Sequence, residues 1–114
     1  MAKSILLEKA DEYARAVYNI IRKFPREEVF GITSQLRRAA LSVPLNITEG
    51  FARQSRGSYR QFISISYASL KESPYLLGFS LRESYIEHET YENIVALGNE
   101  IARMLWAALR TLKA

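Results

Sequence analysis

The sequence predicts an all-α protein, an antiparallel up-down-up-down four-helix bundle, on three observations. Four segments carry apolar residues at helical spacing. The connections between these segments are short. The chain has 114 residues, 48% of them hydrophobic and 25% charged, which suits one globular domain spanning residues 1–114. Amphipathic helices with short connections pack as antiparallel neighbours, so we expect a bundle.

The first helix is expected over residues 4–24. Its apolar residues recur near helical spacing, and its charged residues fall on the opposite face. Ser4 is a plausible N-cap residue. Pro25 ends the helix because the residue before a proline resists the α conformation. Pro25 and the two glutamates that follow suit a single helical turn before Gly31, which allows a sharp change of direction.

The second helix is expected from Thr33, a good N-cap residue, to residue 51 or 52. Its apolar residues form one stripe along the helix and should face the core. This stripe consists of Ile32, Leu36, Ala39, Ala40, Val43, Ile47 and Phe51.

Two prolines lie inside predicted helices and predict kinks, one at Pro44 and one at Pro74. Pro44 cannot donate to the carbonyl of Ala40, and its ring crowds that carbonyl. Asn46, Thr48 and Glu49 follow Pro44, and we expect them to satisfy backbone groups that the kink leaves unpaired.

The third helix is expected to start between Ser55 and Ser58 and to reach about Ser84. Ser58 and Gln61 match a capping box. Residues 63–67 alternate as a strand would, but the helical pattern around them is longer and favours a helix. Four serines form a small-residue face that either lets another helix approach closely or is solvated. They are Ser66, Ser69, Ser73 and Ser80.

The fourth helix follows a turn around residues 85–89. Ile94 and Ile101 lie seven positions apart on one face, and glutamates crowd the helix start, as the helix dipole favours. Trp106 and Leu109 are expected to reach a second surface.

Composition limits the class of protein. The chain has no cysteine, no apolar run of about 20 residues that could span a bilayer, and early charges where a signal peptide would be apolar. We therefore expect a cytoplasmic protein. The net charge is +4, and residues 26–60 hold six arginines against three glutamates, which suggests an acidic partner.

Catalytic chemistry is hard to assemble from these residues. His88 is the only histidine and Asp11 the only aspartate, and nothing in the spacing brings both to a serine. His88 and Glu92 lie one turn apart but supply too few ligands for a metal site. No phosphate-binding glycine loop with a lysine is present. We expect no enzymatic activity, no cofactor and no metal.

The best candidate site is basic and would contact phosphate groups. The residues are Arg37, Arg38, Arg53, Arg56 and Arg60. The last three cluster with serines around the predicted start of the third helix. Pairing within a helix, for instance between Glu49 and Arg53, is the alternative interpretation.

Five tyrosines invite a base-stacking interpretation, namely Tyr59, Tyr67, Tyr75, Tyr85 and Tyr91. Packing in the core or in an interface is the better interpretation for Tyr67 and Tyr91.

Residues 31–50 resemble the signature of a bacterial four-helix-bundle family encoded in intervening sequences of large-subunit ribosomal RNA genes. The segment reads GITSQLRRAALSVPLNITEG, and the resemblance extends to residues 24–25, residues 53–55 and the general helix layout. The sequence departs from the family at residues 71–75, where the third helix usually continues without proline.

The resemblance implies a homopentamer with a basic surface that binds nucleic acid, and no enzymatic activity. The family is related to the accessory variability proteins of diversity-generating retroelements, which implies a reverse transcriptase as a partner. Five copies of +4 would carry +20 on one particle, so weak sites would add up.

Our leading hypothesis is a non-enzymatic, homo-oligomeric protein that binds RNA or DNA without sequence preference. The alternative is a scaffold that docks a partner protein.

Overall fold

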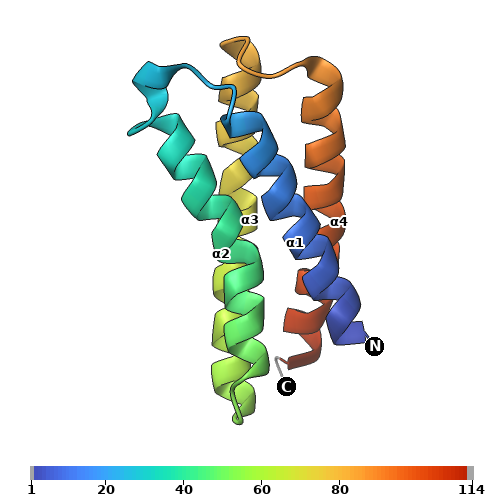
Figure 1. The fold of residues 1–114 in the computed structure, drawn as a ribbon. Coiled ribbons are helices and arrows are strands. Elements are labelled where there is room, and N and C mark those ends of the chain that lie inside the picture. Colours follow the sequence, from blue (N-terminus) through green and yellow to red (C-terminus); the bar gives the residue numbers. More distant parts are fainter. Residues whose placement is uncertain (1, 113–114) are drawn as a thin grey trace.

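The structure is a computed structural model that describes residues 2–112, with side chains from residue 5 onward. It contains α1 (Ala2–Ile21), the 3₁₀ turn η1 (Arg26–Glu28), α2 (Ile32–Phe51), α3 (Arg56–Arg82) and α4 (His88–Leu112). Successive helices run in opposite directions (Figure 1). The predicted all-α four-helix bundle is confirmed. Residues 63–67 are helical, so the strand alternative is wrong.

The core lies along the centre of the bundle. Each helix packs on the next, and α1 also packs on α4, which closes the ring of helices. Tyr13, Leu36, Ile63 and Ile101 are fully buried, one from each helix. No helix in the described residues is long and apolar enough to cross a membrane.

The ends of α1 differ from the prediction. The helix begins at Ala2, so Ser4 is not its N-cap residue, and it ends at Ile21. The last turn tightens because the N–H groups of Lys23 and Phe24 donate to carbonyls three residues back. Phe24 is still buried.

The start of α2 also differs. The helix begins at Ile32 with Gly31 as its N-cap, so Thr33 lies inside it and is buried. The Oε1 atom of Glu28 accepts a hydrogen bond from the Ile32 N–H at 3.3 Å and takes the role predicted for Thr33. A residue of the preceding turn therefore caps this helix.

The helix α2 continues through Pro44, and α3 continues through Pro74. Asn46 Nδ2 donates to the Ser42 carbonyl at 2.8 Å, and Thr48 Oγ1 donates to the Pro44 carbonyl at 2.9 Å. Both side chains thus serve the backbone beside the proline, although neither bond goes to the Ala40 carbonyl. The same expectation for Glu49 is wrong, because its carboxylate pairs with Arg53 at 3.0 Å. The kinks at the two prolines stay predictions.

Small side chains line the contact between α2 and α3. Ser66, Ser73 and Ser80 are fully buried, and Ser66 Oγ donates to the Val43 carbonyl at 2.9 Å. Three of the four predicted serines are therefore not solvated, and Ser69, which is half-buried, bonds to Ser42 of α2 at 2.8 Å. The helix α3 starts within the predicted range, with Ser55 as its N-cap, so the capping box at Ser58 is not used. The helix ends two residues before Ser84.

A hydrogen bond ties η1 to the turn between α3 and α4. The Tyr85 hydroxyl donates to Glu28 Oε2 at 2.9 Å. This bond, helped by burial, raises the pKa of Tyr85 to about 12, because ionisation would place a second negative charge beside the carboxylate. The Glu28 carboxylate therefore caps α2 and also binds Tyr85 in the turn that follows α3.

We expect Ser66→Val to lower the free energy of unfolding by about 2 kcal/mol, through overpacking between α2 and α3 and loss of the bond to Val43. Urea unfolding followed by circular dichroism measures this. Ala68→Val adds a similar side chain at an exposed site of the same helix and should cost about 0.5 kcal/mol. Equal costs at both positions would contradict a tight contact at Ser66.

We expect the Tyr85–Glu28 bond to stabilise the fold fully below pH 10 and to lose its effect as the pH rises toward 12. The pKa of Tyr85 is raised in the folded state, so the unfolded chain ionises first. The difference in tyrosinate absorbance between wild type and Tyr85→Phe isolates this hydroxyl. Its midpoint should fall in a Glu28→Gln background and stay unchanged with Glu12→Gln. An unchanged midpoint with Glu28→Gln would refute the assignment.

Candidate nucleic-acid interface

The five arginines predicted to contact phosphate occupy two separate places. Arg37 and Arg38 lie in the first half of α2. Arg53 follows the end of α2, and Arg56 and Arg60 lie in the first turns of α3. At 1.5 Å per residue, α2 extends about 21 Å from residue 37 to its end. One molecule therefore does not gather all five side chains.

The side chain of Arg53 contacts neighbouring residues of the protein itself. Its guanidinium pairs with Glu49 at 3.0 Å and lies over the ring of Phe62, 4.6 Å from the centroid. The intrahelical pairing that the sequence left open is present. Because a carboxylate neutralises it, Arg53 adds little to the surface potential.

Arg56 bonds to the backbone of another helix. Its Nη2 donates to the Thr111 carbonyl at 2.9 Å, and this carbonyl belongs to the last turn of α4, where intrahelical donors are missing. The first turn of α3 is also occupied, since Ser55 Oγ accepts from the Ser58 N–H at 3.1 Å. Arg60 is half-buried. At this end of the bundle, polar side chains therefore bond to the end of α4 and to the start of α3.

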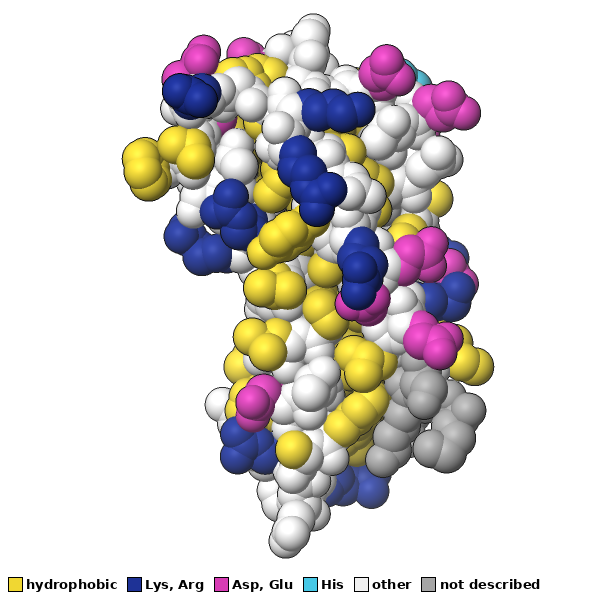
Figure 2. All heavy atoms as spheres, in the orientation of Figure 1, with side chains coloured by type: hydrophobic (Ala, Val, Ile, Leu, Met, Phe, Trp, Pro, Cys, Tyr) yellow, Lys and Arg dark blue, Asp and Glu magenta, His cyan; other side chains and the backbone are white. Residues whose placement is uncertain are grey.

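The positive charge gathers at the opposite end of α2. Residues 15–38 cover the second half of α1, η1 and the start of α2, and we call them the basic segment. The basic segment holds six basic and two acidic side chains, which leaves ten of each in the rest of the chain. The entire net charge of +4 thus comes from this segment. On the face of the molecule drawn in Figure 2, most Lys and Arg side chains lie over the upper half.

Two arginines of the basic segment are bound only to neutral partners. Arg38 Nη1 donates to Ser34 Oγ at 3.0 Å, and Arg22 Nη1 donates to Asn19 Oδ1 at 3.2 Å. Both side chains are exposed and keep their charge for a ligand. Arg15 differs, because it pairs with Asp11 at 2.8 Å.

A shallow hollow of about 390 Å³ runs between α1 and α2 within this face. Arg15 from α1 and Arg22, which directly follows this helix, line it, with Tyr18 and Asn19 between them and Leu41 on the α2 side. Asp11, the partner of Arg15, also lines it. The sequence prediction omitted Arg15 and Arg22. Their seven-residue spacing on the polar face of the first predicted helix was the signal that could have identified them.

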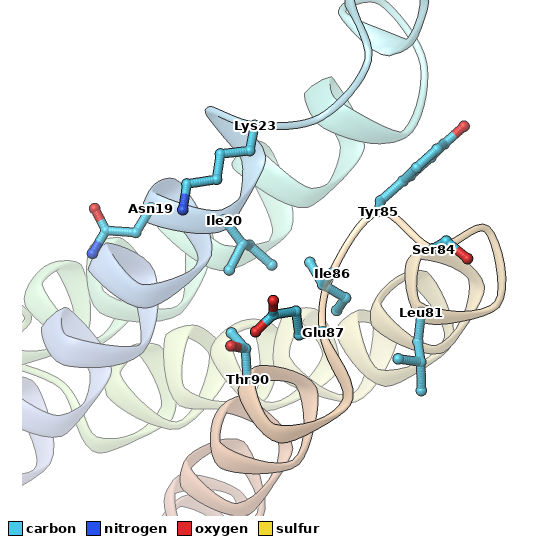
Figure 3. Close-up of a pocket in the computed structure, with 9 residues that line it drawn as sticks. All are labelled: Asn19, Ile20, Lys23, Leu81, Ser84, Tyr85, Ile86, Glu87 and Thr90. Atoms are coloured by element: carbon cyan, nitrogen blue, oxygen red, sulfur yellow. The ribbon is translucent and has the colours of Figure 1, made fainter.

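Another hollow, of about 760 Å³, lies where the end of α1 meets the turn between α3 and α4 (Figure 3). Lys23 and Glu87 are the charged residues among those that line it. The Tyr85 hydroxyl points away from the hollow.

The candidate metal ligands remain two exposed side chains. His88 Nδ1 lies 3.6 Å from Glu92 Oε2 at the start of α4. Among the described residues, no three histidine, cysteine or acidic side chains come close enough together to hold a metal ion.

Comparisons with known proteins agree with this fold. A family model described as 23S rRNA-intervening sequence protein matches residues 2–107. Six chains of solved structures match, among them a protein from Bacteroides thetaiotaomicron described as of unknown function and from the S23 ribosomal protein family. That protein is 27% identical, with a TM-score of 0.88 over 96% of this chain and 99% of its own. No curated protein matches.

Proposed function

The chain belongs to the 23S rRNA-intervening sequence protein family, and we propose that it is a non-enzymatic, homo-oligomeric protein whose basic segment binds nucleic acid without sequence preference. One observation carries the proposal. The whole net charge of +4 lies in residues 15–38, at one end of the bundle. A concentrated positive surface attracts phosphate backbones whatever their sequence.

Arg22 and Arg38 are the phosphate ligands in this proposal. A guanidinium bonded to a neutral side chain retains its charge and several N–H donors, which match a phosphate group bidentately. Arg22 lines the hollow between α1 and α2, and Leu41 on its far side follows Arg38 by one turn of α2. A phosphate backbone lying along this hollow would meet both arginines.

The connection between η1 and α2 exposes apolar side chains, which supports the proposal of an oligomer. Phe30 is 95% exposed, and its neighbour Val29 is also exposed. The connection is not loose, because Gly31 N–H donates to the Glu28 carbonyl at 2.9 Å and Glu28 is held by Tyr85. An aromatic side chain left in water forgoes about 2 kcal/mol of burial, which favours a partner for it.

We place Phe30 of one copy in an apolar hollow on the next copy. This hollow, of about 590 Å³, has an apolar floor of Leu7 from α1 and of Leu41, Pro44 and Leu45 from α2, and Glu8, Asp11 and Thr48 complete its lining. Leu45 lies about 20 Å along α2 from its start, too far for Phe30 of the same chain. Such a head-to-tail contact generates a ring when it closes, and the family resemblance implies five copies.

A protein-interaction scaffold is the second candidate, and the exposure of Phe30 favours it too. In that case the tip would dock a partner protein, such as a reverse transcriptase. The oligomeric state separates the two candidates, because a monomeric chain would leave Phe30 for a different protein.

Replacing Arg22 and Arg38 together by Gln should weaken binding to RNA and DNA of any sequence. The slope of the logarithm of the association constant against the logarithm of salt concentration should become less negative by about two, one unit per lost phosphate contact. Fluorescence anisotropy at several salt concentrations measures both. The pair Arg53→Gln and Arg60→Gln removes the same charge and is the matched control. An equal loss in the control would move the site away from the basic segment.

Light scattering at micromolar concentration should show a multimer for the wild type and a smaller species for Phe30→Ser. The substitution removes the aromatic anchor of the contact without touching the core. Tyr75→Ser is the control, since Tyr75 is also an exposed aromatic residue but lies on α3. A monomeric wild type would refute the ring.

A further inference from the structure

The groove between α3 and α4 carries an aromatic pair that the basic segment does not explain. Trp106 is 50% exposed on α4, and its ring centroid lies 5.6 Å from that of Tyr67 on α3, with the planes tilted by 37°. These two rings border a hollow of about 260 Å³. The hollow is lined by Tyr67, Lys71, Asn99, Ala102, Arg103 and Trp106.

The charges of this hollow are positive and unneutralised. Lys71 from α3 and Arg103 from α4 are both exposed, and neither forms an ion pair with another described residue. Glu100, the acidic neighbour on α4, is engaged by Lys9 at 3.0 Å. Two free cations from different helices thus flank one large, half-exposed aromatic ring.

We propose that this groove binds an unpaired base of a single-stranded nucleic acid. The base would stack on the open side of Trp106, while Lys71 and Arg103 contact the adjoining phosphates and Asn99 offers an amide to the base edge. Base–aromatic stacking tolerates any sequence, because every base has a π-face, and cations beside the ring follow the backbone. The hollow lies below the usual size of a drug-like ligand pocket, which suits one base.

This inference rests on the proposed nucleic-acid function and adds the form of the ligand. The order of packing in the described helices places the α3–α4 groove on the side of the bundle away from the α1–α2 hollow. The two sites therefore differ in kind. The basic segment attracts any phosphate backbone, whereas the groove accepts only bases that are free of a duplex, since paired bases are buried in their own stack.

Trp106 is the only tryptophan of the chain, so its emission reports on this groove alone. A short oligodeoxythymidylate should quench the emission at low salt, whereas a duplex of equal length should bind with little quenching. Anisotropy of a labelled oligonucleotide measures binding separately. Trp106→Leu should weaken single-strand binding roughly tenfold, and Trp106→Phe less, because one base stack is lost or reduced.

Arg103→Gln tests the same groove without changing the aromatic pair and should weaken single-strand binding severalfold. Arg82→Gln removes the same charge at an exposed site at the end of α3 and should have little effect. Single strands that bind without quenching, and equally well to Trp106→Leu, would overturn this inference and leave the proposed function intact. If neither single strands nor duplexes bind at low salt, both proposals fail.

Discussion

The close contact between α2 and α3 sets the spacing on which the rest of the bundle depends. The fully buried Ser66 donates to the Val43 carbonyl, and the hydroxyl of Ser42 on α2 bonds to that of Ser69 on α3 at 2.8 Å. Small side chains let the two helices approach, and the Ser66 hydroxyl finds a backbone acceptor inside the core. The helices α1 and α4 then complete the core beside this pair, with Tyr13 and Ile101 among the fully buried residues.

The two ends of the α2–α3 hairpin use polar side chains differently. Where α3 begins, Arg53, Arg56 and Ser55 bond to a carboxylate, a carbonyl and an N–H of the protein itself. At the other end of α2, Arg22 and Arg38 bond only to neutral side chains. A charge that a carboxylate pairs adds little to the surface potential, whereas exposed and unneutralised charges act on a partner. This contrast is why we place the nucleic-acid surface at the basic segment.

Repetition would strengthen every weak site proposed above. A surface charge of +4 per chain is modest, but copies joined through Phe30 would present several basic segments and several Trp106 grooves to one polymer. Contacts made after the first become intramolecular, so the total affinity exceeds that of a single site. The proposed assembly and the proposed ligand therefore support each other physically.

The sequence by itself determined the four helices, the turn at η1 and most of the buried stripe, because helical periodicity depends on residues within one segment. It also contained the local pair of Glu49 and Arg53. The cap of α2 was misassigned, since Thr33 matches local preferences while Glu28 makes the bond. The start of α3 was expected between Ser55 and Ser58, and Ser55 makes its capping bond. Arg56 meets Thr111 from 55 positions away, and only tertiary packing decided that contact. The meeting of Tyr67 with Trp106 was likewise decided by packing, because the distance between two helices depends on the side chains of both.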